Sequence, residues 1–162
     1  MIDEFMAAVV ADGGQAVRVP DAAAARTAVA ALLGRDASLC FWDGDPLVRS
    51  IEPATLGTLA PAADAQTGIT GAVFGVAATG TIVLTYGEGR SRATGLLPDF
   101  HIALIAADRV LPTLDEAIAR VYATDVPRGM TLVTGASATS DIEQIRVVGV
   151  HGPRRVAVIV VG

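Results

Sequence analysis

Short apolar runs alternate with an alanine-rich helical segment near the start of the chain, and this order restricts the fold more than any other feature. Residues 16–19 predict a strand, and Asp21 predicts the N-cap of a helix that ends before Gly34. Residues 38–42 predict the next strand. A strand, a helix and a strand at this spacing are typical of a parallel sheet. We therefore predict an α/β fold with a mostly parallel sheet.

The rest of the chain adds a β-hairpin and further strands. Residues 70–77 and 81–86 are rich in β-forming side chains, and we expect them to form a hairpin with its tip at Thr79-Gly80. Thr113 to Glu116 has the pattern of a capping box that opens a helix to about residue 122. No repeat or low-complexity linker divides the chain, which predicts one domain over residues 1–162. The other expected elements are a helix at 5–12, a turn at 43–46, a polar loop at 87–98, and strands at 101–106, 130–134, 147–150 and 155–161.

The residues that are scarce or missing exclude several kinds of chemistry. The chain has one cysteine, Cys40, and two histidines, so it cannot ligate an iron–sulfur cluster through cysteines or zinc through three histidines. All twelve basic residues are arginine, which removes a Schiff-base lysine and the lysine of a phosphate-binding P-loop. We expect no cofactor and no metal site, although a mixed carboxylate site stays possible.

The charge and hydropathy patterns restrict the partners. The net charge is −5 and the cations are scattered, so we expect no binding to nucleic acid. No apolar run approaches the roughly 20 residues of a membrane helix, and we expect no membrane span. The first residues carry two acids and no basic segment, unlike a secretory signal. These features predict a cytoplasmic protein.

Two glycine-rich segments resemble nucleotide-binding motifs only in part. Residues 75–81 have the glycine spacing of a P-loop, but Thr81 stands where the lysine is needed, and the segment lies in the expected hairpin. Residues 87–92 begin like a dinucleotide-binding fingerprint, but Arg92 replaces the third glycine. We interpret both segments as turns.

The loop after the strand at 130–134 leaves three interpretations open. Gly135-Ala-Ser137 resembles a nucleophile elbow without its closing glycine, and a hydrolase would also need a histidine near Ser137 with Asp141 behind it. The small residues of the loop also suit backbone binding of an anion at the carboxyl edge of the sheet. Asp141 equally suits the cap of a helical turn.

The two histidines differ in their surroundings. His101 begins a predicted strand, where a hydrogen-bonded structural histidine is favoured over a catalytic one. His151 lies among turn residues, which favours an exposed or ligand-facing position. The candidate ligand-binding residues are Glu88, Arg90, His101, Thr134, Gly135, Ser137, Asp141, Glu143 and His151.

An ordered series of short motifs resembles one known family. The series runs through residues 42–47, 67–72, 78–84, 87–90, 96–102, 107–112, 134–144 and 149–154. In this order the motifs are similar to those of the lactate-utilisation protein C family, whose module is the LUD domain, from about residue 15 onward. The resemblance implies a three-layer α/β/α fold of the type shared with glucosamine-phosphate deaminases (NagB), ribose-phosphate isomerases (RpiA) and CoA transferases.

The resemblance also implies a pathway. It places the chain in bacterial oxidation of L-lactate to pyruvate, as an accessory or ligand-binding component that binds partners or holds a small acidic metabolite. Sister subunits would carry the iron–sulfur chemistry. Two alternatives remain: a free-standing enzyme acting on a phosphorylated or CoA-linked metabolite, and a non-catalytic scaffold.

Four positions depart from the pattern of that family. The family usually has acids at the positions of Val73 and Ala78, and proline and arginine at the positions of Ala136 and Ala138. Loss of an arginine removes a bidentate partner for a carboxylate or phosphate. These changes imply a different ligand or a loss of activity.

We predict that the natively purified chain binds no chromophore, because one cysteine and two histidines cannot hold a cluster and no complete flavin or nicotinamide fingerprint is present. An ultraviolet–visible spectrum tests this. Absorption bands of a cluster or a flavin that follow the protein through gel filtration would contradict it.

Overall fold

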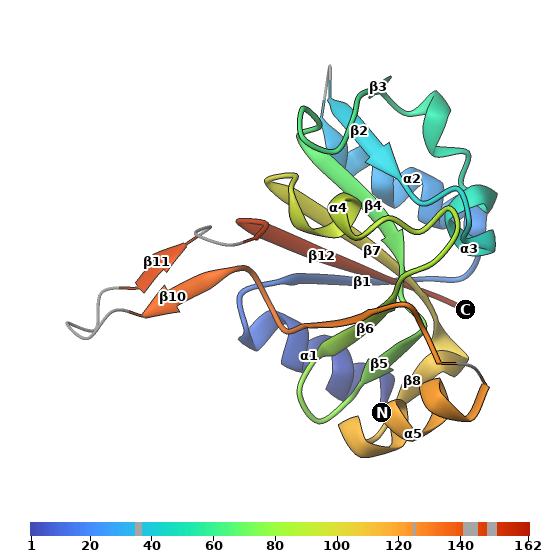
Figure 1. The fold of residues 1–162 in the computed structure, drawn as a ribbon, viewed down its shortest axis with the longest axis vertical. Coiled ribbons are helices and arrows are strands. Elements are labelled where there is room, and N and C mark those ends of the chain that lie inside the picture. Colours follow the sequence, from blue (N-terminus) through green and yellow to red (C-terminus); the bar gives the residue numbers. More distant parts are fainter. Residues whose placement is uncertain (35–36, 125, 141–145, 149–151) are drawn as a thin grey trace.

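A six-stranded sheet, in which every neighbouring pair of strands is parallel, forms the centre of the computed structural model (Figure 1). The structure describes residues 1–34, 37–124, 126–140, 146–148 and 152–162. The prediction of a mostly parallel sheet is confirmed. Across the sheet, the strands are β1 (Gln15–Val19), β12 (Arg155–Val161), β7 (Phe100–Ala106), β4 (Thr67–Gly71), β2 (Ser38–Phe41) and β3 (Thr58–Leu59).

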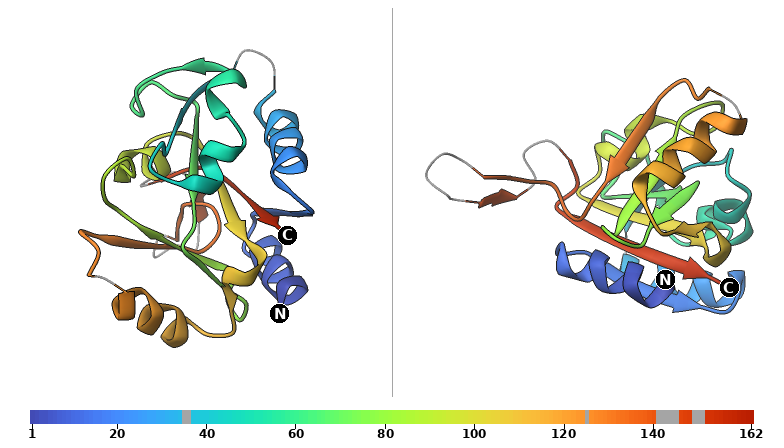
Figure 2. Two further views of the ribbon diagram at one scale, coloured as in Figure 1. Left: turned by 90° about the vertical axis from the view of Figure 1, so that its right-hand side faces the viewer. Right: turned by 90° about the horizontal axis from the view of Figure 1, so that it is seen from below.

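Helices α2 (Ala22–Leu33) and α3 (Pro46–Ser50) cover one face of this sheet (Figures 1 and 2). Helix α2 begins as predicted, because the Asp21 carboxylate accepts a hydrogen bond of 2.8 Å from the backbone N–H of Ala24. Val29 of α2 is fully buried in the cluster that contains Ile102 and Ile159 of the sheet. Helix α3 was not predicted, since Pro46 was interpreted as the end of a turn, whereas it occupies the first turn of a helix.

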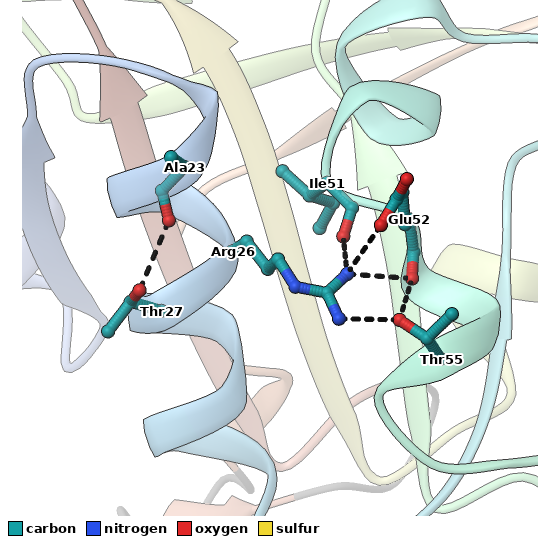
Figure 3. Close-up of polar contacts among 6 residues, drawn as sticks. All are labelled: Ala23, Arg26, Thr27, Ile51, Glu52 and Thr55. Carbon is teal, nitrogen blue, oxygen red and sulfur yellow. Dashed lines mark hydrogen bonds and ion pairs between the residues drawn. The ribbon is translucent and has the colours of Figure 1, made fainter.

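Arg26 of α2 forms hydrogen bonds with the segment that follows α3 (Figure 3). Its guanidinium donates hydrogen bonds to the backbone oxygens of Ile51 at 2.8 Å and Glu52 at 3.2 Å, and to the Thr55 hydroxyl at 2.6 Å. Glu52 has a φ of 49°, a left-handed conformation that is costly for a residue with a side chain. The bonds from Arg26 hold this turn and the 3₁₀ helix η1 (Pro53–Thr55) against α2.

A second, four-stranded sheet lies on the other side of the central sheet together with α1 (Ile2–Ala11) (Figure 1). In order, its strands are β8 (Val110–Leu111), β5 (Phe74–Val76), β6 (Thr81–Thr85) and β9 (Met130–Val133). The predicted hairpin is confirmed, because β5 and β6 are antiparallel neighbours joined by residues 77–80. The expected strand at 70–77 is divided, however, since residues 70–71 belong to β4 of the central sheet.

Apolar side chains fill the space between the two sheets. Phe5 and Val9 of α1, Leu84 of β6, Ile105 of β7 and Val158 of β12 are each at most 1% exposed and form one cluster. Helix α5 (Leu114–Thr124) then covers the outer face of the second sheet. The predicted α/β layering around a mostly parallel sheet is thus confirmed, and the second sheet is an addition that the sequence did not reveal.

The remaining elements lie in the connections. Helix α4 (Arg92–Leu96) and the 3₁₀ helix η2 (Ala107–Arg109) flank β7. Strands β10 (Ala138–Ser140) and β11 (Arg146–Val148) form a separate two-stranded ribbon that projects from the body (Figure 1). Of the strand expected at 147–150, the described residues 147–148 lie in β11 and pair with β10, not with the central sheet. Within the described ranges, no helix is long and apolar enough to cross a membrane.

The turn of the β5–β6 hairpin presses on the backbone of α1 at Gly80. This residue has a φ of 64°, and a Cβ atom there would lie 2.5 Å from the backbone nitrogen of Val9. Gly13 has a φ of 81° but open space around it. We expect Gly80→Ala to lower the free energy of unfolding by about 1–3 kcal/mol, and Gly13→Ala by about 1 kcal/mol or less. Urea unfolding of both variants measures this, and equal losses would show that the hairpin tip does not press on α1.

Candidate functional site

The loop after β9, which the sequence singles out, lies at the amino edge of the central sheet. The backbone N–H of Ser137 donates a hydrogen bond of 2.9 Å to the oxygen of Pro153, which lies just before β12. The expected place was the carboxyl edge, where the loops that follow parallel strands meet. Strand β9 belongs instead to the second sheet and pairs antiparallel with β6, so the loop that follows it runs to the opposite edge.

Three of the predicted residues, Thr134, Gly135 and Ser137, line one cleft there, which we call the Ser137 cleft and which measures about 310 Å³. None of the described residues that line it is charged. The Thr134 hydroxyl is hydrogen-bonded to Thr81 at 2.7 Å, and the backbone N–H of Ser137 is already used. A Cβ atom at Gly135, whose φ is 68°, would collide with the backbone of Asp12 at the end of α1. The loop therefore lines the cleft with small and hydroxyl side chains, and the N–H of Ser137 is not available to a ligand.

His101 lies in the core near the start of β7 and does not reach a cleft. It is fully buried, and its Nε2 is 2.8 Å from the hydroxyl of Thr70 on β4. Its Nδ1 has no hydrogen-bond partner among the described residues. Burial lowers the pKa of His101 from 6.5 to about 4, so the imidazole is neutral at neutral pH. This is the geometry of a hydrogen-bonded core histidine.

The hydrolase interpretation gains nothing from this arrangement. A general base must reach the hydroxyl of its nucleophile, but His101 is bonded to Thr70 and is sealed from the Ser137 cleft. The other partners that the interpretation needs, Asp141 and His151, lie outside the described residues, as does Glu143. Glu88 lies exposed in the turn at 87–90, which packs on Gly44.

Arg90 lines a different cleft, of about 370 Å³, beside α5 on the outer face of the second sheet. We call it the arginine cleft, because four of the described arginines line it. Its floor is apolar, from Val73, Phe74 and Val121. Tyr86 lines both this cleft and the Ser137 cleft. The four arginines are Arg90, Arg109, Arg120 and Arg128.

The arginine cleft is positively charged in an acidic chain. None of its described lining residues is an aspartate or a glutamate, whereas the whole chain has a net charge of −5. It adjoins the carboxyl edge of the central sheet, because Val73 and Arg109 also line a hollow that contains Leu104 and Ala106 at the end of β7. Clustered guanidinium groups at such an edge can hold a carboxylate or a phosphate through paired N–H groups.

Sequence reasoning found only Arg90 of these four residues. Arg109 follows the strand at 100–106, and ligands often bind at the carboxyl ends of such strands, whereas Arg128 precedes the strand at 130–133. Searching the cations that flank expected strands would have selected them. Arg120 lies inside a helix and offers no such signal.

The positions that depart from the family pattern do not surround one pocket. Val73 lines the arginine cleft, and Ala136 lines the Ser137 cleft. Ala78 is exposed in the turn between β5 and β6, and Ala138 lies in β10. The changes thus fall in several places, and the one at Val73 leaves the arginine cleft without an internal acid. Across the described residues, no group of three or more histidine, cysteine or acidic side chains is placed to hold a metal ion.

A family model described as the LUD domain matches residues 52–161. A lactate utilization protein C of Deinococcus radiodurans is 47% identical over 97 residues, which cover 58% of this chain and 45% of the relative. The protein of the same name from Halalkalibacterium halodurans is 36% identical over 128 residues, 74% of this chain and 51% of the relative. The chain thus spans about half the length of the curated relatives that it matches.

A solved structure has the same fold over nearly the whole chain. It is the crystal structure of a DUF162 family protein from Deinococcus radiodurans, with a TM-score of 0.74 and 27% sequence identity. The match covers 99% of this chain and 96% of the other.

We predict that acid destabilises the fold through His101. Its pKa is lowered to about 4 on folding, so between pH 6.5 and 4 the unfolded state binds more protons and the free energy of unfolding falls as the pH falls. Across that window the loss is about 3 kcal/mol, and above pH 6.5 the contribution of His101 is constant. Urea unfolding from pH 4 to 7.5 measures it. His101→Gln should flatten the profile relative to His151→Gln, and an unchanged slope in His101→Gln would contradict the assignment.

Proposed function

Because the chain belongs to the LUD domain family, we propose that it serves bacterial L-lactate utilisation as an accessory component that binds a small acidic metabolite. Relatives called lactate utilization protein C support the pathway. In this proposal residues 1–162 act as one LUD-like domain, and the reaction served is the oxidation of L-lactate to pyruvate.

The observation that carries the binding role is the arginine cleft. Four guanidinium groups from separate segments meet at one hollow in a chain of net charge −5. Arg90 and Arg128 have no carboxylate partner among the described residues, so a bound anion would compensate positive charge there. The Ser137 cleft lacks charged lining residues in the described part of the chain, so it is the weaker site for an acid.

The redox chemistry is assigned to partners. One cysteine and two histidines in the whole sequence leave the chain without the ligands of an iron–sulfur cluster. We propose that iron–sulfur sister subunits oxidise the lactate in the cytoplasm, while this chain binds the metabolite or the partners.

The test is growth on L-lactate as the sole carbon source after the coding sequence is disrupted in its host. We expect growth on L-lactate to be lost and growth on pyruvate to be unchanged, because pyruvate enters metabolism after the proposed step. Complementation with the intact chain should restore growth. Equal growth of the disrupted and parent strains on L-lactate would refute the proposed pathway.

The same strain tests the site. Complementation with the double variant Arg90→Gln/Arg128→Gln should fail, because it removes two cations of the arginine cleft. Arg49→Gln is the matched control, since Arg49 is an exposed arginine on α3 outside this cleft. Full rescue of growth by the double variant would show that lactate utilisation does not depend on the arginine cleft.

A further inference from the structure

We infer that the arginine cleft selects a small anion that carries at least two negative charges, and that it discriminates against monocarboxylates such as lactate itself. This inference rests on the proposed function for the choice of the cleft, and it narrows the class of ligand. Its basis is the charge that the cleft leaves uncompensated, the positions in which the arginines are held, and the shape of the apolar floor.

Two of the four arginines of the cleft already have an acidic side chain nearby. Arg120 forms an ion pair with Glu116 at 2.7 Å, one turn earlier in α5. Arg109 has Asp108 at 3.9 Å, and both side chains are more than half exposed, so this contact is weak. Among the described residues, neither Arg90 nor Arg128 has a carboxylate within ion-pair distance.

Within the described part of the chain, at least two guanidinium groups of the cleft therefore have no carboxylate counter-charge. A monocarboxylate can neutralise one of them and would leave the other without an anionic partner. A ligand with two anionic groups, or with one doubly charged phosphoryl group, pairs both. In both kinds of ligand, oxygen atoms accept hydrogen bonds from paired N–H groups of a guanidinium.

Two of the arginines are held in place before any ligand binds. Arg90 donates a hydrogen bond of 3.3 Å from its guanidinium to the hydroxyl of Thr85, a buried residue at the end of β6. Most of its five N–H donors stay available. The Arg109 guanidinium lies over the ring of Phe74, 5.9 Å from its centre. Cations that are positioned in this way lose less conformational entropy when an anion binds.

The apolar floor of the cleft restricts the carbon skeleton of the ligand. Phe74 is 8% exposed and Val121 is 7% exposed, so the floor is a packed apolar surface rather than loose side chains. A volume of about 370 Å³ suits a small metabolite. The cleft thus fits a short carbon skeleton with charged groups that reach the arginines at its rim.

Isothermal titration calorimetry at constant ionic strength tests the inference with three probes. Inorganic pyrophosphate represents phosphoryl ligands, succinate represents dicarboxylates, and L-lactate is the monocarboxylate. We expect pyrophosphate or succinate to bind at least about tenfold more tightly than L-lactate, since each charge-assisted contact contributes about one order of magnitude or more. Whichever of the two binds more tightly identifies the source of the charge.

The variants locate the binding. Arg90→Gln/Arg128→Gln should raise the Kd of the better probe by at least about tenfold, whereas Arg49→Gln should leave it unchanged; circular dichroism confirms that each variant is folded. No binding of either dianion, equal binding of L-lactate, or an unchanged Kd in the double variant would each overturn the inference. Growth on L-lactate is an independent readout. If the strain needs the chain for growth on L-lactate but the purified chain binds neither pyrophosphate nor succinate, the inferred class of ligand is wrong. The proposed pathway would still stand.

Discussion

The central parallel sheet carries apolar side chains on both of its faces, so neither face can be left in water. In β7, Ile102 and Leu104 pack toward α2, whereas Ala103 and Ile105 pack toward α1 and the second sheet. All four side chains are fully buried. Parallel sheets need such double coverage, because their crossover connections and apolar strands leave no solvated face. This requirement explains why the second sheet exists: α1 alone covers only part of the second face.

The second cover brings the cations together. Strands β5, β6 and β9 present one face to the central sheet and the other to α5, and the arginine cleft opens beside α5 on that outer face. Arg90 lies in the turn after β6, Arg120 lies in α5, and Arg128 lies just before β9. Arg109 lies in η2, directly after β7. The charge concentration is therefore a product of topology. No local stretch of the sequence contains it.

This difference between local and long-range order explains which features can be predicted from the sequence. The Asp21 cap, the Thr113 cap and the positive φ at Gly80 depend on a few adjacent residues, and the sequence identified each position. The bend that divides the expected strand at 70–77 between two sheets has no proline to mark it, so the sequence predicts one strand there. Because β9 belongs to the second sheet, the loop with Ser137 lies at the amino edge of the central sheet and not at the expected carboxyl edge. The cleft arginines, spread from residue 90 to 128, depend on that same topology.

The position of Arg90 depends in turn on the end of β2. The indole N–H of Trp42 donates a hydrogen bond of 2.8 Å to the oxygen of Ser91, and the N–H of Gly44 donates one of 3.0 Å to the oxygen of Gly89. Trp42 is only 1% exposed and packs edge-on against Tyr86, with ring centres 6.0 Å apart. The residues on both sides of Arg90 are therefore held by groups from the segment that follows β2. A buried tryptophan that serves as core packing thus also holds a surface cation at the rim of the cleft.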